Sequence, residues 1–231
     1  MKILGVIPAR KGSKGIKDKN LITLGKMHLI EYTLQFTSKI SQLDKVILTT
    51  DSDEIMEIGK KYNHVDIPFK RPAELSTDYA NISDVAIHAL DECNNKYKNE
   101  FSHVALFQPT SPFRKIEEIN NSINEVIKNR YESIFSVNEV IHHPSEYITI
   151  KENNYELILP PESKNEQRQF YDTVYFINGS FYMCSVDFLK KYKSFLTPKS
   201  KPVIFSKSSS FDIDDDFDLK LARNSIKNNA E

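Results

Sequence analysis

Two charged segments near opposite ends of the chain contain residue types that can bind a phosphate and a metal ion. The first is RKGSKGIKDKN, residues 10–20, which follows a short apolar run. Its cations include Arg10, Lys14 and Lys19, and its small residues are Gly12, Ser13 and Gly15. Small residues let backbone amides approach an anion. The G-x-x-x-x-G-K-[ST] and G-x-G-x-x-G spacings are both absent. We therefore expect a cationic loop suited to a triphosphate, with a solvated basic turn as the alternative.

The second charged segment is FDIDDDFD, residues 211–218. If its first half is extended, Asp212 and Asp214 point to one side and Asp215 points to the other. Two carboxylates on one side suit Mg²⁺, which prefers oxygen ligands and keeps waters and substrate phosphates. The alternative is a helix start rich in acidic residues, which the helix dipole favours. That alternative accounts better for the later aspartates than for Asp212 and Asp214.

Two further motifs supply hydrogen-bond donors. QPTSP, residues 108–112, ends an apolar run with a turn stiffened by two prolines. Its donors are Gln108, Thr110 and Ser111, and a simple helix-capping turn is the alternative. Arg168 precedes the pair Asn178–Gly179 and could hold a substrate carboxylate with two parallel hydrogen bonds. An ordinary surface arginine is the alternative there.

The elements that must position these motifs alternate along the chain. Strand-type runs occupy residues 2–8, 45–50, 65–69, 103–108, 133–137, 174–183 and 203–206. Helical patterns occupy residues 27–40, 53–62 (with Asp51 or Ser52 as the cap), 81–97, 115–129, 186–193 and 216–228. This alternation predicts right-handed βαβ units and a mostly parallel sheet. Ligands of such sheets bind beyond the carboxyl ends of the strands, where the basic loop and QPTSP both fall.

The pattern changes after about residue 138. Residues 147–161 predict an antiparallel hairpin that turns at Glu152–Asn154. We therefore expect a single domain over residues 1–231 with an inserted element at approximately 138–175, either an arm or a dimer contact.

Composition restricts the class of protein. A chain of 231 residues with 39% hydrophobic residues is sufficient for one α/β domain. A net charge of -1 argues against nucleic-acid binding, and no apolar run approaches the ~18–20 residues of a membrane span. The two cysteines, Cys93 and Cys184, form no metal-binding or disulfide pattern. We expect a cytoplasmic protein with neither a nucleic-acid nor a membrane partner.

Taken together, the motifs resemble those of the acylneuraminate cytidylyltransferases, the CMP-sialic acid synthetase family. The matching pieces are IPARKGSKGIKDKN (7–20), TTDSDEI (49–55), RPAELSTD (71–78), HAL (88–90), QPTSPFR (108–114), HHP (142–144), RQ (168–169), NGSFY (178–182) and FDIDDDFDL (211–219). They span nearly the whole chain, and their order and spacing are more specific than any single piece. The resemblance implies a Rossmann-like nucleotidyltransferase domain, a three-layer α/β sandwich, with a smaller dimerisation element that makes a homodimer.

The resemblance also implies a reaction. The anomeric hydroxyl of a 2-keto sugar acid attacks the α-phosphorus of CTP, pyrophosphate leaves and a CMP-sugar forms. Such a transfer depends mainly on positioning and charge stabilisation. Mg²⁺, for which Mn²⁺ can substitute, would be bound by Asp212 and Asp214.

Residue roles follow from the same resemblance. The nucleotide would be bound by Arg10, Gly12, Ser13, Lys14, Gly15, Lys19, Asn20, Arg71, Ala80, Ser83 and Gln108. The sugar acid would face Gln108, Thr110, Ser111, Arg168 and Asn178. The catalytic set would be Arg10, Lys14, Arg168, Asp212 and Asp214.

Departures from the family's pattern leave the identity of the sugar open. They lie at Lys11, at Ser145–Glu146 after HHP, and at Phe176–Ile177 before Asn178. Legionaminic acid, pseudaminic acid, N-acetylneuraminate and other nonulosonates all remain candidates. His142 and His143 are expected to be loop histidines without a chemical role.

Two alternative functions remain. One is an enzyme that uses 3-deoxy-manno-octulosonate, against which NGSFY and HHP argue. The other is a catalytically inactive homologue kept as a binding or scaffold subunit. The opposed charges of Arg10, Lys14, Asp212 and Asp214 argue against this second alternative.

Overall fold

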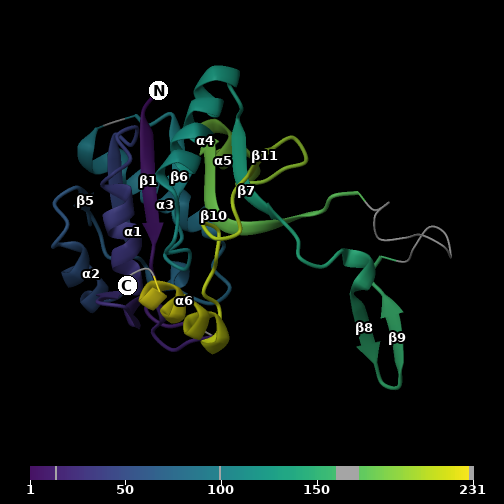
Figure 1. Ribbon diagram of the computed structural model, residues 1–231. Helices are drawn as coiled ribbons and strands as arrows, with labels where there is room; N and C mark the ends of the chain where they lie inside the picture. The colour runs from purple at the N-terminus through teal and green to yellow at the C-terminus, as the bar shows by residue number, and fades with distance from the viewer. Residues whose placement is uncertain (14, 99, 160–171, 229–231) are drawn as a thin grey trace.

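The computed structural model describes residues 1–13, 15–98, 100–159 and 172–228, and is built around one seven-stranded sheet (Figure 1). The strand order is β11-β7-β10-β6-β1-β4-β5. The strands are β1 (Ile3–Pro8), β4 (Lys45–Thr49), β5 (Val65–Asp66), β6 (His103–Leu106), β7 (Ser133–Glu139), β10 (Tyr175–Ser185) and β11 (Lys201–Ile204). Only β10 runs antiparallel to its neighbours, so the predicted mostly parallel sheet is confirmed.

Helices cover both faces of this sheet. The helices α1 (Leu29–Thr37), α2 (Asp53–Gly59) and α4 (Ile116–Asn129) share one hydrophobic cluster, and α3 (Ile82–Tyr97) and α5 (Val186–Tyr192) share another. Strand β1 contributes to both clusters: Ile3 and Ile7 pack in the first, and Leu4 and Val6 pack in the second. A strand buried on both faces is apolar throughout instead of alternating, which explains the apolar run before the basic loop. The predicted three-layer sandwich is confirmed.

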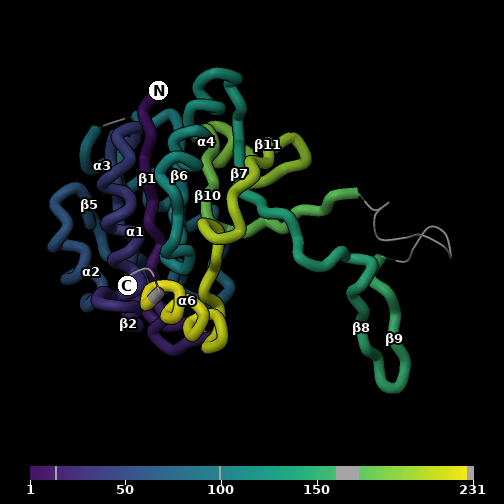
Figure 2. Tube along the Cα trace, in the orientation of Figure 1, coloured from purple at the N-terminus to yellow at the C-terminus, as the bar shows by residue number. Residues whose placement is uncertain are grey.

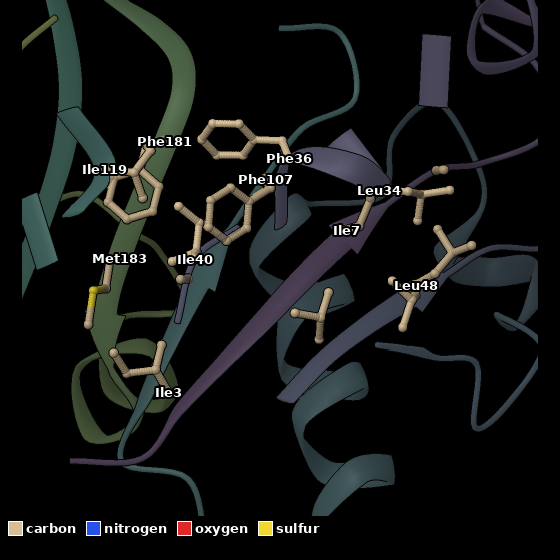
Figure 3. Close-up of a cluster of buried hydrophobic side chains, with 14 of the residues drawn as sticks. Ile3, Ile7, Leu34, Phe36, Ile40, Leu48, Phe107, Ile119, Phe181 and Met183 are labelled. Carbon is tan, nitrogen blue, oxygen red and sulfur yellow. The ribbon is translucent and has the colours of Figure 1, made fainter. Parts of the chain in front are cut away.

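Aromatic packing in the first cluster fixes the start of the QPTSP turn. Figure 3 shows Phe107 between Phe36 of α1 and Phe181 of β10, with ring centroids 6.3 and 5.4 Å away. The backbone N–H of Phe107 also donates to the carbonyl of Val6 at 3.0 Å. Because Phe107 immediately precedes Gln108, the sheet and the core together set where the turn begins.

A third cluster closes the carboxyl end of the sheet. It joins the C-terminal helix α6 (Asp216–Asn228) to the basic loop and to the segment that follows the loop, through Ile16, Leu24, Leu29, Ile213, Leu219 and Ala222. In Figure 1, α6 lies just beyond the arrowhead of β1. Between β1 and α1, the chain forms a 3-10 helix, η1 (Lys19–Leu21), and a small antiparallel ladder of β2 (Thr23–Leu24) with β3 (Met27–His28). The two charged segments are therefore folded against the same end of the sheet.

Some predicted boundaries were wrong, for local reasons. The helix expected from residue 27 begins at Leu29, because Met27–His28 pairs with β2 and His28 forms a reciprocal cap with Glu31. Strand β5 has two residues instead of five, and a proline at position 68 stands within the predicted run. Of the two candidate caps of α2, the structure uses Ser52, which accepts a hydrogen bond from the N–H of Ile55.

The predicted hairpin is confirmed as β8 (Ile148–Lys151) and β9 (Asn154–Leu157), preceded by the 3-10 helix η3 (Pro144–Glu146). Figure 2 shows this arm standing apart from the body. Its role as a dimer contact stays a prediction. His143 caps η3 by accepting from the N–H of Ser145, a local structural role. Among the described helices, none is long and apolar enough to cross a membrane.

Candidate active site

A cleft of about 300 Å³ lies beyond the carboxyl ends of β1 and β6. These two strands are neighbours, and the chain moves away from β1 on one side through β4 and β5 and returns on the other side at β6. Such a reversal of strand order is where open α/β sheets bind ligands. The predicted site residues among its walls are Arg10, Gly12, Ser13, Lys19, Asn20, Arg71, Ala80, Gln108, Thr110, Asp212 and Asp214. The basic loop, QPTSP and the aspartate segment therefore meet at one cleft.

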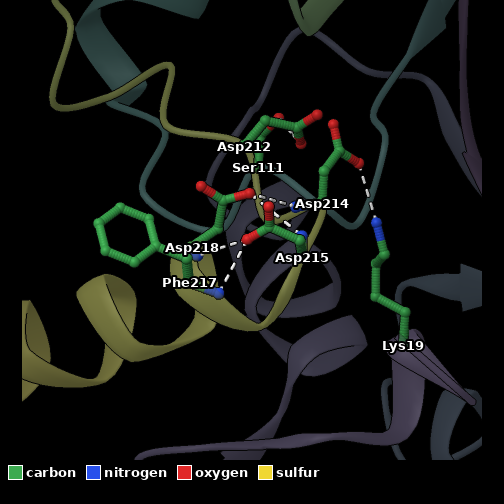
Figure 4. Close-up of polar contacts among 7 residues, drawn as sticks. All are labelled: Lys19, Ser111, Asp212, Asp214, Asp215, Phe217 and Asp218. Atoms are coloured by element: carbon green, nitrogen blue, oxygen red, sulfur yellow. Dashed lines mark hydrogen bonds and ion pairs between the residues drawn. The ribbon is translucent and has the colours of Figure 1, made fainter. Parts of the chain in front are cut away.

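The aspartate segment presents two carboxylates to this cleft. Ile213 is fully buried, and its N–H donates to the carbonyl of Thr110 at 2.9 Å. With Ile213 turned inward, Asp212 and Asp214 face the opposite way, as the alternation of an extended chain predicts. Figure 4 shows both carboxylates on one side of the segment. Asp214 forms an ion pair with Lys19, whose Nζ lies 2.9 Å from Asp214 Oδ1.

Asp212 is the more deeply placed of the two carboxylates. Burial is the largest influence and raises its pKa, and a hydrogen bond from Thr110 opposes that rise. The negative charge of Asp214 raises the pKa of Asp212 further, whereas Lys19 and Arg114 lower it. Ser111 Oγ donates to Asp212 Oδ1 at 3.3 Å. Two neighbouring carboxylates of this kind repel one another, and a bound cation would relieve that repulsion.

The donor set fits Mg²⁺ better than a metal that needs a full cage of side chains. Across the described residues, no group of three or more His, Cys, Asp or Glu side chains is placed to hold an ion. Mg²⁺ takes one or two carboxylates and completes its octahedron with waters and substrate phosphates. Asp212 and Asp214 beside a cationic loop offer that combination.

The remaining aspartates start helix α6. Asp215 Oδ1 accepts from the N–H groups of Phe217 and Asp218 at 2.8 and 3.0 Å. In return, Asp218 Oδ2 accepts from the N–H groups of Asp214 and Asp215. This reciprocal cap satisfies helix N–H groups that have no partner within the helix. The helix-start alternative therefore applies to Asp215 and Asp218, and the cleft-facing interpretation applies to Asp212 and Asp214.

The basic loop is held in place by backbone contacts. Asn20 Nδ2 donates to the carbonyl of Arg10 at 3.0 Å, which closes the loop on itself. Gly12 has a φ of 79°, a backbone conformation that residues other than glycine rarely adopt. Lys19 is buried to 7% exposure in η1. Lys14 lies outside the described residues, so its predicted phosphate contact stays a prediction.

Arg10 reaches across the mouth of the cleft. Its Nη2 lies 2.5 Å from Asp78 Oδ1, and the two side chains are each about one-third exposed. Asp78 also lines the cleft. In the sequence, Asp78 stands within RPAELSTD, and no role was predicted for it. Nothing in the residue types indicated that this carboxylate would meet the basic loop.

Arg71 forms part of the cleft wall and is 5% exposed. Its Nε donates to Thr49 Oγ1 at 3.1 Å, and its Nη2 donates to the Thr49 carbonyl. Burial lowers the pKa of Arg71 to about 10, so the side chain stays charged at neutral pH. Ala80 lies in the same wall, as predicted. Ser83 does not: it is buried at the start of α3, and its hydroxyl donates to Asn81 Oδ1 and to the carbonyl of Lys193.

The residues expected to face the sugar acid divide into two groups. Gln108 and Thr110 line the cleft. Ser111 and Asn178 do not line it, which corrects their predicted roles: Ser111 is fully buried and donates to Asp212, whereas Asn178 Oδ1 accepts from Ser136 Oγ at 2.6 Å. Both residues form hydrogen bonds with other side chains of the protein behind the cleft surface. Arg168 lies outside the described residues, and its contact with a carboxylate stays a prediction.

Arg114 was missed. It is buried beside the QPTSP turn and donates hydrogen bonds to the carbonyls of Gln108, Ser111 and Ser180. In the sequence, Arg114 is marked only by its position at the end of QPTSPFR, two residues after the turn, and this position alone does not indicate its function.

The chain is similar in sequence and in fold to known proteins. A family model described as cytidylyltransferase matches residues 4–199. The chain is 32% identical to the CMP-N,N'-diacetyllegionaminic acid synthase of Legionella pneumophila over 100% of this chain and 99% of that protein. It is 27% identical to the pseudaminic acid cytidylyltransferase of Campylobacter jejuni, with the same coverage of both chains.

A third relative is longer than this chain. The N-acylneuraminate cytidylyltransferase of Escherichia coli is 31% identical over 96% of this chain and 51% of that protein, so the chain spans about half of its length. Among solved structures, a CMP:2-keto-3-deoxy-manno-octonic acid synthetase complexed with CTP matches with a TM-score of 0.72 at 12% identity, covering 99% of this chain and 100% of that one. At that identity, the match concerns the fold alone.

Proposed function

The chain belongs to the cytidylyltransferase family, and from this premise we propose that it activates a nonulosonic, 2-keto sugar acid with CTP. The products are a CMP-sugar and pyrophosphate. One observation carries the proposal: a cationic glycine-containing loop and a pair of cleft-facing carboxylates, from opposite ends of the chain, line the same cleft. That combination suits a triphosphate and its cation.

The nucleotide would occupy the part of the cleft between the basic loop and Arg71. Arg10 and the loop amides would bind phosphate oxygens, and Lys14 is proposed to join them. Arg71 is fixed by Thr49 before any ligand arrives, so little entropy is lost when it meets the nucleotide. The chain would orient the triphosphate so that its α-phosphorus faces the acceptor. Holding the two reactants in this geometry can remove much of the activation barrier of such a transfer.

The acceptor sugar acid would lie toward Gln108 and Thr110. Gln108 lines the cleft just after the end of β6. We propose that Arg168 binds the sugar carboxylate, because a guanidinium can donate two parallel hydrogen bonds to it. Two relatives that match this chain end to end are named for legionaminic and pseudaminic acids, which supports a nonulosonic acid.

Asp212 and Asp214 would hold Mg²⁺, with Mn²⁺ as a substitute. An ion bound there would neutralise charge on the triphosphate. Lys19 pairs with Asp214 in the absence of other ligands, so it offsets part of the repulsion between the two carboxylates.

We propose that the arm forms a dimer contact with a second copy of the chain. Its hairpin has two unlike faces: Ile148 pairs with Leu157 and Ile150 with Tyr155 on one face, all exposed, whereas the intervening positions are polar. A two-stranded hairpin is marginally stable alone in water, and an apolar face of this kind is typically covered by a partner. The buried, free thiols of Cys93 and Cys184 suit a reducing compartment, and we propose that the enzyme works in the cytoplasm.

The direct test is to incubate the protein with CTP, Mg²⁺ and a panel of acids while pyrophosphate release is measured. The panel contains legionaminic, pseudaminic, N-acetylneuraminic and 3-deoxy-manno-octulosonic acids. Release with one or more nonulosonic acids, and with CTP in preference to ATP or UTP, supports the proposal. Release with the octulosonate alone supports that alternative substrate, and binding of CTP without any release supports an inactive homologue.

A further inference from the structure

Arg114 joins two segments that line or support the acceptor side of the cleft. Nη1 donates to the carbonyl of Ser111 at 2.6 Å and Nη2 donates to the carbonyl of Gln108, so two bonds hold the turn after β6. Nε donates to the carbonyl of Ser180 in β10 at 2.6 Å. A fourth bond, from Nη1 to Thr33 Oγ1 at 3.2 Å, reaches helix α1.

This guanidinium is an unusual group to bury. Among the described residues, its partners are three carbonyls and one hydroxyl, and no carboxylate forms an ion pair with it. Burial lowers its pKa to about 9, and the charge of Asp212 opposes that shift. A buried cation without a contacting anion costs free energy that an apolar side chain of similar volume would not. We therefore attribute the presence of a buried arginine here to the geometry that its hydrogen bonds impose on the neighbouring backbone.

The other side of Gln108 is constrained by Gly179. Gly179 has a φ of 73°, and a Cβ on it would lie 2.9 Å from Gln108 Oε1. The amide of Gln108 thus packs directly on the glycine in the irregular part of β10, while the carbonyl of Gln108 is held by Arg114. Ser111 is held in the same way: Arg114 binds its carbonyl, and its hydroxyl donates to Asp212.

We propose that Arg114 is a positioning residue for the sugar acid. Its guanidinium fixes the spacing between the 108–111 turn and residues 178–180, which places Gln108 toward the acceptor. The inference rests on the proposed function, and it assigns Arg114 to the acceptor half of the site only. None of its hydrogen bonds to the described residues reaches the basic loop or Arg71, so the contacts of those residues with CTP itself should not depend on it.

The test compares Arg114→Lys with Thr33→Val. Lysine keeps the positive charge but replaces the rigid fork by one ammonium group, which cannot hold the carbonyls of both segments in the same geometry. We expect the KM for the sugar acid to rise at least about tenfold and kcat to fall, while the Kd of CTP, measured by calorimetry without Mg²⁺ and without sugar acid, stays within about twofold. Thr33→Val removes only the bond to α1 and should leave both constants unchanged.

Two results would overturn the inference: a folded Arg114→Lys variant with an unchanged KM for the sugar acid, or equal weakening of sugar acid and CTP. If Arg114→Lys does not fold, Gly179→Ala provides the test instead. Its added methyl group would displace the side-chain amide of Gln108 while the guanidinium of Arg114 stays in place. It should raise the KM for the sugar acid and spare the Kd of CTP, and the opposite result counts against the inference. A wild-type protein that releases no pyrophosphate with any acid overturns the proposed function first, whereas an active wild type makes the variants a test of Arg114 alone.

Discussion

Gly15 lies against the backbone of Asp214: a Cβ on Gly15 would stand 2.2 Å from the Asp214 carbonyl oxygen. The basic loop and the aspartate segment, from opposite ends of the chain, are therefore in direct contact. The ion pair between Lys19 and Asp214, at 2.9 Å, joins the same two segments a second time. Any displacement of one segment moves the other, so phosphate and cation binding should be coupled.

The first prediction follows from that contact. Gly15→Ala must push the Asp214 backbone away, because 2.2 Å is far inside van der Waals distance. Overpacking of this kind costs roughly 1–3 kcal/mol, so we expect kcat/KM for CTP to fall roughly tenfold to a hundredfold if the strain is released by moving the site. The measurement is steady-state pyrophosphate release at fixed sugar acid, together with the thermal midpoint.

Gly12→Ala is the matched control. Its added methyl group meets no atom of the described residues within 4 Å, but the residue must keep a φ of 79°. Its penalty therefore reports backbone strain in the loop without a clash against Asp214. Equal losses of activity in the two variants would mean that the contact with Asp214 has no special importance.

The second prediction concerns Asp78. Its carboxylate occupies Arg10 at the mouth of the cleft, where a phosphate would compete for the same guanidinium. Asp78→Asn keeps the shape and removes the competing charge. Part-exposed ion pairs are worth about 0.2–1 kcal/mol, so we expect the affinity for CTP, measured by calorimetry, to increase by up to about fivefold.

Asp91→Asn provides the control, because Asp91 pairs with Lys190 on the surface away from the cleft. It should leave the affinity for CTP unchanged. A weaker affinity in Asp78→Asn would show instead that Asp78 helps to bind the nucleotide.

The third prediction separates Asp215 from its neighbours. As the cap of α6 it accepts two backbone hydrogen bonds. Asp215→Ala should lower the free energy of unfolding by about 1 kcal/mol, whereas Asp215→Asn should be nearly neutral because asparagine caps helices equally well. Urea denaturation measures both. Equal stability of the alanine variant and the wild type would argue against the capping role.

The placement of the aspartates was predictable from the sequence, and the reason is periodicity. Asp212 and Asp214 flank an apolar residue in an extended segment, and alternation alone puts them on one face. The convergence of the basic loop and QPTSP was predictable as well, because the carboxyl ends of parallel strands share one edge of the sheet.

The fate of individual polar residues was not predictable. Ser111 and Asn178 have hydroxyl and amide groups suited to a ligand, yet the structure uses them inside the protein, on Asp212 and on Ser136. Residue type cannot tell whether such a group meets a ligand or another buried group. The task of Arg114 was hidden for the same reason, since three of its partners are backbone carbonyls, which leave no mark in the sequence.

The fourth prediction concerns the arm. Ile150 is 75% exposed on the apolar face of the hairpin. If that face contacts a second copy, Ile150→Lys should convert a dimer to a monomer, as measured by light scattering after size-exclusion chromatography. Thr149→Lys adds the same charge on the polar face and should leave the dimer intact. A wild-type protein that is monomeric at micromolar concentration would rule out the proposed contact.

The most direct test of the central claim is the rate of pyrophosphate release against Mg²⁺ concentration in Asp212→Asn, Asp214→Asn and Asp215→Asn. An amide keeps the size of the side chain but lacks the charge that a hard cation requires. The first two variants should need at least about tenfold more Mg²⁺ for half-maximal rate, with part of the activity recovered at high Mg²⁺ or Mn²⁺ because weakened binding obeys mass action. Asp215→Asn should follow the wild-type curve. A shifted requirement in Asp215→Asn, or an unchanged one in both other variants, would contradict the account.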